Sequence, residues 1–448
     1  MKLIYDVEAK PVFKKRLVFA FQQVLAIMAA TIAVPLIVKN GMSTSAALFG
    51  AGVGTLVYIA FTHKKSPVFL GSSFAFIGSM VSAFSTAASV SLGYVGLILG
   101  AFFAGLVYVL FAILIRFLGT KWVSTLLPPV VIGPTVAIIG LSLAANAVND
   151  LQTTNLTQVH SQWAILCGVV TLIATMLAST NGNRTLRLIP FIIGITVGYI
   201  FAMILTFIGL STGIETMQII NFQPLMDLFK DGIQFSSFFA MPSFTFLEAA
   251  KGLKDLDFAY TASIFVAYVP VALVVFAEHI ADHKNISSII ERDLLKDPGL
   301  DKTLLGDGVG SMVGAFFGGC ANTTYGESVA CVALSKNASV STILLAAIEC
   351  IFISFLHPFV ALLSTIPSCV MGGVCMALYG FIAVSGLKML KNVDLDVDHN
   401  LYVVSAILIA GIGGLSLNFG NLNLTSVACA MLLGILVNRI LKYRAAVK

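Results

Sequence analysis

The chain has 448 residues, of which 58% are hydrophobic and only 10% are charged. Soluble domains carry about 25% charged residues, so this composition argues against a large soluble core and predicts a polytopic membrane protein. The formal net charge of +5 reflects how Lys and Arg are shared between loops, and it gives no indication of nucleic-acid binding.

Apolar stretches near the ~20 residues that cross a bilayer recur along the whole chain. We expect an all-α membrane protein with about fourteen such segments, some of them short or interrupted. The expected spans are 17–38, 45–62, 67–84, 94–118, 123–147, 162–180, 188–211, 259–283, 303–319, 322–334, 339–364, 367–387, 400–418 and 424–441.

The distribution of basic residues orients these spans. If both termini lie on one side, all but four of the 26 Lys and Arg residues fall on that side. The exceptions are Lys39, Lys230, Lys251 and Lys254. The positive-inside rule makes the basic side cytoplasmic. We therefore expect a lipid-embedded, multi-pass protein of the cytoplasmic membrane with both termini inside the cell.

The third and tenth spans are broken by polar and small residues, and they resemble each other. Residues 72–75 read Ser-Ser-Phe-Ala, and residues 323–326 read Thr-Thr-Tyr-Gly. The fifth and twelfth spans share a proline five residues before a glycine. Both pairs lie seven spans apart, which is an odd number, so the two halves must run in opposite directions. This pattern indicates an inverted repeat, and paired interrupted segments indicate the central site of a transporter.

Three acids lie in or beside these spans. Glu278 and Asp282 are four residues apart and share one helix face, while Glu327 belongs to the broken tenth segment. Acids at membrane depth default to a functional role, and neighbouring acids titrate as a coupled set. We expect these three to converge on one cavity and to couple proton movement to substrate. Local capping is the alternative for Glu278, and solvation at the cytoplasmic boundary is the alternative for Asp282.

Other titratable residues receive weaker interpretations. We interpret His279 as a packing or interfacial histidine, and His283 as a membrane-edge residue without a role. Asp307 lies between two glycines, and we expect it to bond to the irregular tenth segment. For Glu349 we expect an interior partner. The sequence Glu-His-x-x-x-His differs from the zinc-protease motif, so no metal site is predicted.

Four motifs carry a family resemblance. Residues 322–327 (Asn-Thr-Thr-Tyr-Gly-Glu) resemble the signature of the nucleobase–ascorbate transporters, and in particular their uracil-carrying members. Residues 70–76, 276–279 and 297–300 resemble further family motifs, and the likeness extends over essentially the whole chain. It implies two inverted sets of seven segments, with a short strand in the third and tenth.

The same resemblance implies a division into two domains. A core domain would comprise residues 1–120 and 259–366. A gate domain, which would also form a homodimer, would comprise residues 121–258 and 367–448. The implied function is not enzymatic: it is proton-coupled uptake of uracil by alternating access, with the proton as coupling ion and no other cofactor.

Site residues follow from the resemblance position by position. Glu278 and Glu327 would hydrogen-bond the edge of the pyrimidine ring. The backbone at Phe74 and Gly326 would face the carbonyls, with the Phe74 ring packing on the base. Three further residues would line the pocket: Tyr325, Ala30 and, from the gate, Tyr379. Glu278, Asp282 and Glu327 would take part in proton coupling.

The sequence also departs from the family pattern. Gln22-Gln23 stands where members often have Gln-His, and Ser328 stands where uracil carriers commonly have Asn. Asp282 replaces a histidine found in some members, although aspartate also occurs there.

Three alternative functions stay open at this point. A purine base such as xanthine or urate is one, although purine carriers usually have Gln at the position of Glu327. A sulfate-type anion is another, but no Lys or Arg lies near the centre of either broken segment. An intramembrane enzyme or a channel would need a nucleophile–base pair or a filter-like ring, and neither is recognisable.

Overall fold

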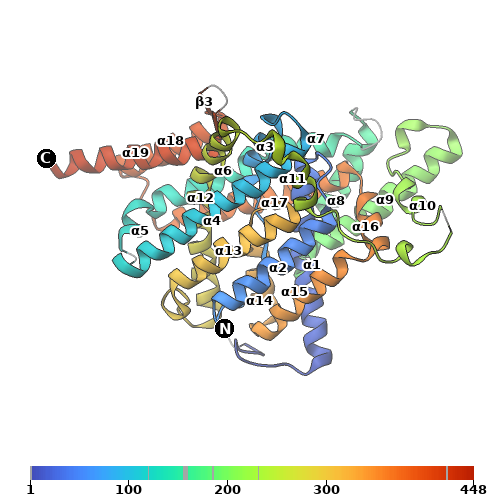
Figure 1. Cartoon of the computed structure of the whole chain (residues 1–448), viewed down its shortest axis with the longest axis horizontal. Helices are drawn as coiled ribbons and strands as arrows, with labels where there is room; N and C mark the ends of the chain where they lie inside the picture. The colour runs from blue at the N-terminus through green and yellow to red at the C-terminus, as the bar shows by residue number, and fades with distance from the viewer. Residues whose placement is uncertain are drawn as a thin grey trace.

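The computed structural model describes residues 3–119, 121–154, 160–183, 186–230, 232–419 and 422–447, and it is almost entirely helical (Figure 1). Within these residues, eight helices are long and apolar enough to cross a membrane. The chain therefore has the architecture of an integral membrane protein. The third and tenth expected spans contain the short strands that the resemblance implied.

The helices and strands have the following bounds. The helices are α1 (Phe13–Val38), α2 (Thr44–Phe61), α3 (Ile77–Ser85), α4 (Val90–Leu118), α5 (Lys121–Leu126), α6 (Pro129–Ser142), α7 (Ala144–Gln152), α8 (Gln162–Thr180), α9 (Pro190–Thr212), α10 (Gln223–Asp227), α11 (Thr245–Gly252), α12 (Phe258–Ile290), α13 (Leu300–Gly318), α14 (Gly326–Ser335), α15 (Val340–Ser354), α16 (His357–Ser364), α17 (Ser368–Lys388), α18 (Asp398–Ile412) and α19 (Ser426–Val447). The strands are β1 (Leu70–Ser72), β2 (Asn322–Thr324), β3 (Leu417–Phe419) and β4 (Leu422–Leu424).

Glycines bring α2 and α13 into close contact. A Cβ on Gly50 would lie 2.3 Å from the carbonyl oxygen of Gly314, and one on Gly54 would lie 2.8 Å from that of Gly310. Small residues allow helix backbones to approach in this way inside a membrane. The side-chain amide of Asn322 donates a hydrogen bond to the backbone carbonyl of Gly50 at 3.2 Å. This packing sets the start of β2 against α2, whose C-terminal end leads to β1.

Strands β1 and β2 pair antiparallel, with Leu70 opposite Thr324 and Gly71 opposite Thr323. The Tyr325 hydroxyl donates to the carbonyl of Ser72 at 2.7 Å, so its ring lies across β1. A Cβ on Gly71 would meet that ring at 2.3 Å, and only glycine leaves room for it. The pairing satisfies backbone groups at membrane depth, where water is excluded.

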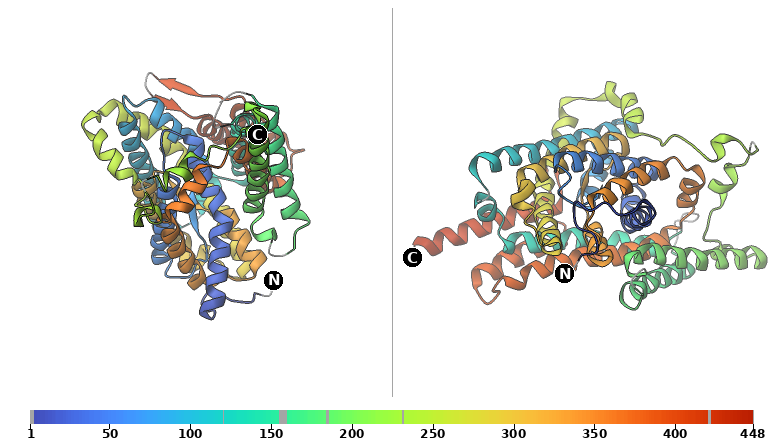
Figure 2. Two further views of the ribbon diagram at one scale, coloured as in Figure 1. Left: turned by 90° about the vertical axis from the view of Figure 1, so that its right-hand side faces the viewer. Right: turned by 90° about the horizontal axis from the view of Figure 1, so that it is seen from below.

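The helices form two sets. One set packs α1, α2, α4, α12, α13 and α15 together, and the other packs α6, α7, α8, α9, α17, α18 and α19. Figure 2 shows α8 and α9, in green, as an outer pair on the second set. Contacts between the sets are made largely through α12 with α6 and α19, and through α1 with α9 and α17.

Helix α12 is longer than the expected span 259–283. It begins after Asp257, whose side chain accepts a hydrogen bond from the Tyr260 amide at 2.6 Å, and it continues to Ile290. A 33-residue helix is about 50 Å long, so it extends beyond the hydrocarbon. The helix thus continues for about two turns past the expected span, through more polar residues.

The N-terminal segment joins two helix ends. The Ala338 amide donates to the Tyr5 carbonyl at 2.9 Å, and the Val340 amide donates to the Val7 carbonyl at 3.0 Å. These bonds attach the segment to the loop after α14. Arg292, just after α12, forms ion pairs with Asp6 and Glu8. The N-terminus thus connects the basic-side ends of the helices that carry Glu327 and Glu278.

Candidate functional site

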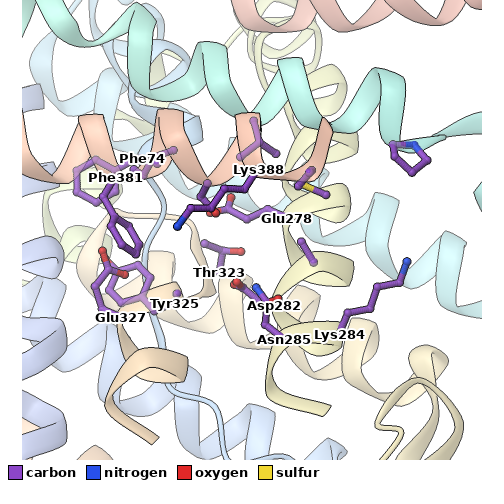
Figure 3. Close-up of a pocket in the computed structure, with 17 residues that line it drawn as sticks. Phe74, Glu278, Asp282, Lys284, Asn285, Thr323, Tyr325, Glu327, Phe381 and Lys388 are labelled. Carbon is purple, nitrogen blue, oxygen red and sulfur yellow. The ribbon is translucent and has the colours of Figure 1, made fainter. Parts of the chain in front are cut away.

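A cavity of about 440 Å³ lies between the two sets of helices (Figure 3). This volume falls in the range of about 300–1,000 Å³ that is usual for small-molecule sites. One wall consists of Phe74, Glu278, Ala281, Asp282, Lys284, Asn285, Thr323, Tyr325, Gly326 and Glu327. The facing wall, from α6, α17 and the turn after α17, consists of Pro129, Val136, Phe381, Ile382, Ser385, Lys388 and Met389.

Three carboxyl groups converge on this cavity. Glu278 and Asp282 come from one face of α12, and Glu327 comes from the first turn of α14. Each acts electrostatically on the others, and Asp307 behind the cavity acts on Glu278 and Asp282. Thr324 donates its hydroxyl hydrogen to Asp282 Oδ2 at 2.8 Å. The four carboxyl groups are therefore close enough for the charge of each to influence the others.

The broken segments aim backbone donors at the same space. Strand β2 ends at Thr324, and α14 starts at Gly326, so the first N–H groups of α14 have no partner within the helix; Gly326 and Glu327 of this turn line the cavity. A helix N-terminus carries a partial positive charge, which stabilises acceptor groups placed there. Thr323, in the middle of β2, has a buried hydroxyl with no hydrogen-bond partner among the described residues. That hydroxyl is therefore free to bond a ligand.

The predicted lining residues fall into two groups. Phe74, Tyr325 and Gly326 line the cavity together with the acids. Tyr379 does not line it; this residue is buried and meets the Phe74 ring edge to face, with ring centroids 5.7 Å apart. Ala30 is fully buried in α1 and does not line it either.

Several lining residues were not foreseen. Lys284 and Lys388 both line the cavity, and Figure 3 shows the Lys388 side chain extending over it. Neither lysine is close in sequence to a broken segment. Phe381 faces the aromatic residues from the opposite wall, and no motif marked it. No signal in the sequence pointed to it, because residues two apart on a helix, such as Tyr379 and Phe381, lie on different faces.

His279 is buried, which agrees with its interpretation as a packing histidine, whereas the bond expected between Asp307 and the tenth segment is wrong. His279 Nδ1 lies 2.6 Å from Asp307 Oδ2, and both side chains are fully buried, so His279 is not interfacial and Asp307 bonds α12 rather than the tenth segment. His283 is also fully buried, with its Nε2 2.7 Å from the Tyr58 hydroxyl. The reason is that α4 packs against α12, while α13 supplies Asp307 and α2 supplies Tyr58 as hydrogen-bond partners.

Glu349 also differs from expectation. Both of its carboxylate oxygens are buried, and neither has a hydrogen-bond partner among the described residues. The interior partner expected for it is therefore absent from that part of the chain. Nothing in the structure explains this acid.

The fold resembles that of known anion transporters. The transmembrane domain of a cyanobacterial bicarbonate transporter, BicA, superposes with a TM-score of 0.63 at 13% identity, covering 96% of this chain and 98% of that one. Murine Slc26a9, an anion transporter, gives a TM-score of 0.65 at 10% identity over 98% of this chain and 69% of its own. At this level of identity the likeness concerns the fold alone.

Sequence relatives are closer. The uracil permease of Bacillus subtilis (strain 168) is 38% identical over 432 residues, which cover 94% of this chain and 92% of the relative. The uracil permease of Bacillus caldolyticus is 36% identical, with coverages of 99% and 96%. That of Escherichia coli (strain K12) is 31% identical, with coverages of 97% and 93%. A sequence profile described as "Permease family" matches residues 14–419.

A cavity where acids of α12 and α14 meet the two broken segments, in a helical membrane fold related to permeases, identifies a membrane transporter rather than an enzyme. The chain belongs to the permease family of nucleobase–ascorbate transporters.

Proposed function

We propose that this protein imports uracil across the cytoplasmic membrane together with protons, by alternating access. The observation that carries the proposal is the convergence of Glu278 and Glu327 in one cavity that also contains an aromatic ring. The relatedness to uracil permeases of three bacteria supports uracil as the substrate.

The cavity has the chemistry that a pyrimidine base needs. Uracil presents two ring N–H donors beside two carbonyl acceptors. Carboxylates of Glu278 and Glu327 accept from the N–H groups, and the Thr323 hydroxyl and the backbone N–H groups near Phe74 and Gly326 donate to the carbonyls. The Phe74 ring and Tyr325 supply an apolar surface for the flat base.

Proton coupling follows from the crowding of acids. Glu278, Asp282 and Glu327 cannot all carry a charge in one desolvated site at little energetic cost, because like charges repel strongly where water is excluded. A bound proton lowers the repulsion and leaves an ionised acceptor for the base. Substrate loading and proton loading therefore favour each other.

The proposed architecture has fourteen segments in two inverted sets of seven. Residues 1–120 and 259–366 form the core domain, and residues 121–258 and 367–448 form the gate domain, which also makes a homodimer in the lipid bilayer. The cavity lies between α12, β2 and α14 of the core and α6 and α17 of the gate. Both termini lie in the cytoplasm.

The cavity faces the basic side of the protein. Its rim contains Lys284, Asn285 and Lys388, which lie on the side that the positive-inside rule assigns to the cytoplasm. These residues support assigning this conformation to the stage at which uracil leaves toward the cell interior.

Uptake of labelled uracil into cells or proteoliposomes, with and without a protonophore, tests the function. Glu327→Ala is expected to abolish uptake while the purified protein keeps its melting temperature to within a few degrees. Glu215→Ala, a change at an exposed acid far from the cavity, serves as the control. Normal uptake by Glu327→Ala would refute the site.

A purine base remains the second candidate, for one structural reason. A cavity of about 190 Å³ adjoins the first and shares Glu327 and Phe381 with it. This extra space is large enough to accommodate the second ring of a purine base. Competition of uracil uptake by thymine, xanthine and urate distinguishes the two, because a purine carrier would be inhibited most strongly by the larger bases.

A further inference from the structure

A fully buried pair of titratable side chains lies directly behind the cavity. His279 Nδ1 and Asp307 Oδ2 are 2.6 Å apart, and the exposed fraction of both side chains is 0%. His279 follows Glu278 in sequence, so the pair lies next to one of the proposed substrate ligands. The proposed site chemistry makes no use of either residue.

The hydrogen bonds of the Thr303 hydroxyl determine which hydrogens this pair carries. Thr303 Oγ1 lies 3.0 Å from His279 Nε2 and 3.2 Å from the carbonyl oxygen of Leu300. A hydroxyl has one hydrogen to donate, so it serves one of these two acceptors at a time. The choice that Thr303 makes determines which hydrogens the pair must carry.

In the first arrangement, Thr303 donates to Leu300. His279 Nε2 must then carry a hydrogen and donate it to Thr303, and the contact with Asp307 needs a second hydrogen. In the other arrangement, Thr303 donates to a bare Nε2, and His279 Nδ1–H donates to the Asp307 carboxylate. The two arrangements differ by one proton, and the same heavy-atom positions accommodate both.

We propose that His279 and Asp307 together hold the proton that is transported with the substrate, and that Thr303 rotates its hydroxyl as this proton enters and leaves. This inference rests on the proposed function, since it assumes proton-driven transport of uracil. With the proton the pair is neutral, and without it the pair carries one negative charge. The proton arrives from water on the outer side and returns to water on the inner side, and no other bond changes.

A second observation points to the same pair. Asp307 Oδ1 is buried and has no hydrogen-bond partner among the described residues. An ionised carboxylate with one oxygen unsatisfied costs several kcal/mol more inside a protein than in water. The neutral, proton-loaded pair avoids most of this cost. The arrangement therefore suits a group that is neutral for part of the transport cycle.

The groups around the pair transmit its charge to the cavity. Those that face it from the neighbouring elements are Glu278, Asp282 and His283 on α12, Tyr58 on α2 and Tyr108 on α4. Asp307 acts electrostatically on Glu278 and Asp282. A neutral pair allows Glu278 to be ionised and to accept a substrate N–H, whereas a negative pair opposes this.

His283 does not take part in holding or releasing the proton, although its ring stacks on the His279 ring with centroids 4.0 Å apart. Its Nδ1 lies 2.8 Å from the His279 carbonyl, which only accepts, so Nδ1 carries the hydrogen. Its Nε2 then accepts from the Tyr58 hydroxyl at 2.7 Å. This fixes His283 as a neutral neighbour with one tautomer.

Asp307→Asn tests the proposal in proteoliposomes. The asparagine amide donates to a neutral His279 Nδ1, which imitates the loaded pair but cannot release a proton. We expect uracil binding and uracil counterflow to persist, while the accumulation ratio driven by an imposed pH gradient falls from well above one to one. Asp301→Asn, the same change in the first turn of α13, is the matched control and keeps wild-type accumulation.

Thr303 variants give a second measurement if Asp307→Asn does not fold. Thr303→Val removes the hydroxyl that bonds Nε2 in both arrangements, so the balance between the loaded and the unloaded pair changes and the pH profile of uptake shifts. Thr303→Ser keeps the hydroxyl and restores the profile. An unchanged profile in Thr303→Val would overturn the proposal.

Two results with Asp307→Asn would also overturn it. One is wild-type accumulation, which would show that the pair is not needed for coupling. The other is loss of uracil binding at every pH by a folded protein, which would make Asp307 a substrate-positioning residue. These outcomes are separate from failure of the proposed function, which would appear as a wild-type protein that neither binds nor accumulates uracil.

Discussion

The side-chain amide of Gln23 donates a 2.5 Å hydrogen bond to the hydroxyl oxygen of Ser328, which is 305 residues further along the chain. Both residues depart from the pattern common in the family, and the structure shows that they contact each other. Ser328 also accepts from the Phe69 amide at 3.0 Å. A single buried hydroxyl thus joins α1, the segment before β1 and the first turn of α14.

Ser328→Ala is expected to weaken uracil binding. The change leaves two buried donors, Gln23 Nε2 and the Phe69 amide, without an acceptor, at a cost of about 1–3 kcal/mol each. We expect a lower melting temperature and at least a several-fold higher Kd, because Glu327 precedes Ser328 directly. Ser364→Ala, at an exposed hydroxyl that bonds only its own helix, is the control. Equal Kd and melting temperature in both variants would contradict this prediction.

Thr324→Val is expected to impair uptake more than it impairs folding. It removes the hydroxyl that donates to Asp282 Oδ2 at 2.8 Å, and a hydrogen bond to a charged group is worth about 1.5–3 kcal/mol. Uptake by Thr324→Val should fall about tenfold or more, and Thr324→Ser should recover most of it. Initial rates of uracil uptake at several pH values measure this. A Val variant as active as the Ser variant would show that the bond has no functional role.

Gly71→Ala is expected to disrupt the site. The added methyl group would meet the Tyr325 ring at 2.3 Å, and the ring cannot withdraw without breaking its bond to the Ser72 carbonyl. We expect loss of uptake and a destabilisation of about 1–3 kcal/mol, typical of overpacking. Gly380→Ala, at a helical glycine with open space around it, should behave as wild type. Retained uptake in Gly71→Ala would mean that β1 can shift at no cost.

Attachment of the N-terminal segment is expected to weaken in acid. The Arg292 guanidinium holds the pKa of Glu8 below its ordinary value of 4.5. A carboxyl with a lowered pKa stabilises the folded contact above the unfolded value, and this contribution disappears as the pH falls through the folded value. Hydrogen-exchange protection of the Ala338 and Val340 amides should therefore decrease below about pH 4.5.

The effect at Glu8 should be small, because its side chain is 64% exposed and surface ion pairs contribute little. Arg292→Gln should lower the protection at neutral pH and remove most of its pH dependence. Protection that is independent of pH in the wild type would indicate that the backbone bonds alone hold the segment.

Local sequence was sufficient to locate the acids. Glu278 and Glu327 stand out because a carboxyl in apolar sequence is costly at membrane depth, and both line the same cavity. The broken segments were recognisable because glycine and hydroxyl residues interrupt spans of otherwise regular length. These features depend on residues close together in the chain, so they are visible without coordinates.

The second wall and the buried pair depend on packing between distant segments. Phe381 and Lys388 lie on α17, whose apolar and small residues are spread around the helix, so nothing in its sequence indicates which face lines the cavity. The contact between His279 and Asp307 depends on how α13 lies against α12. The position of His283 at the end of an apolar run suggested exposure, whereas α12 continues beyond it and α2 supplies the Tyr58 hydroxyl to it.

The antiparallel pairing of β1 with β2 has a mechanical consequence. Leu70–Ser72 and Asn322–Thr324 are hydrogen-bonded to each other. The two strands therefore cannot separate without breaking backbone hydrogen bonds, and no water is present at this depth to replace them. In the proposed alternating-access cycle, the two broken segments would therefore move together as one rigid unit, and the wall formed by α6 and α17 would move relative to them.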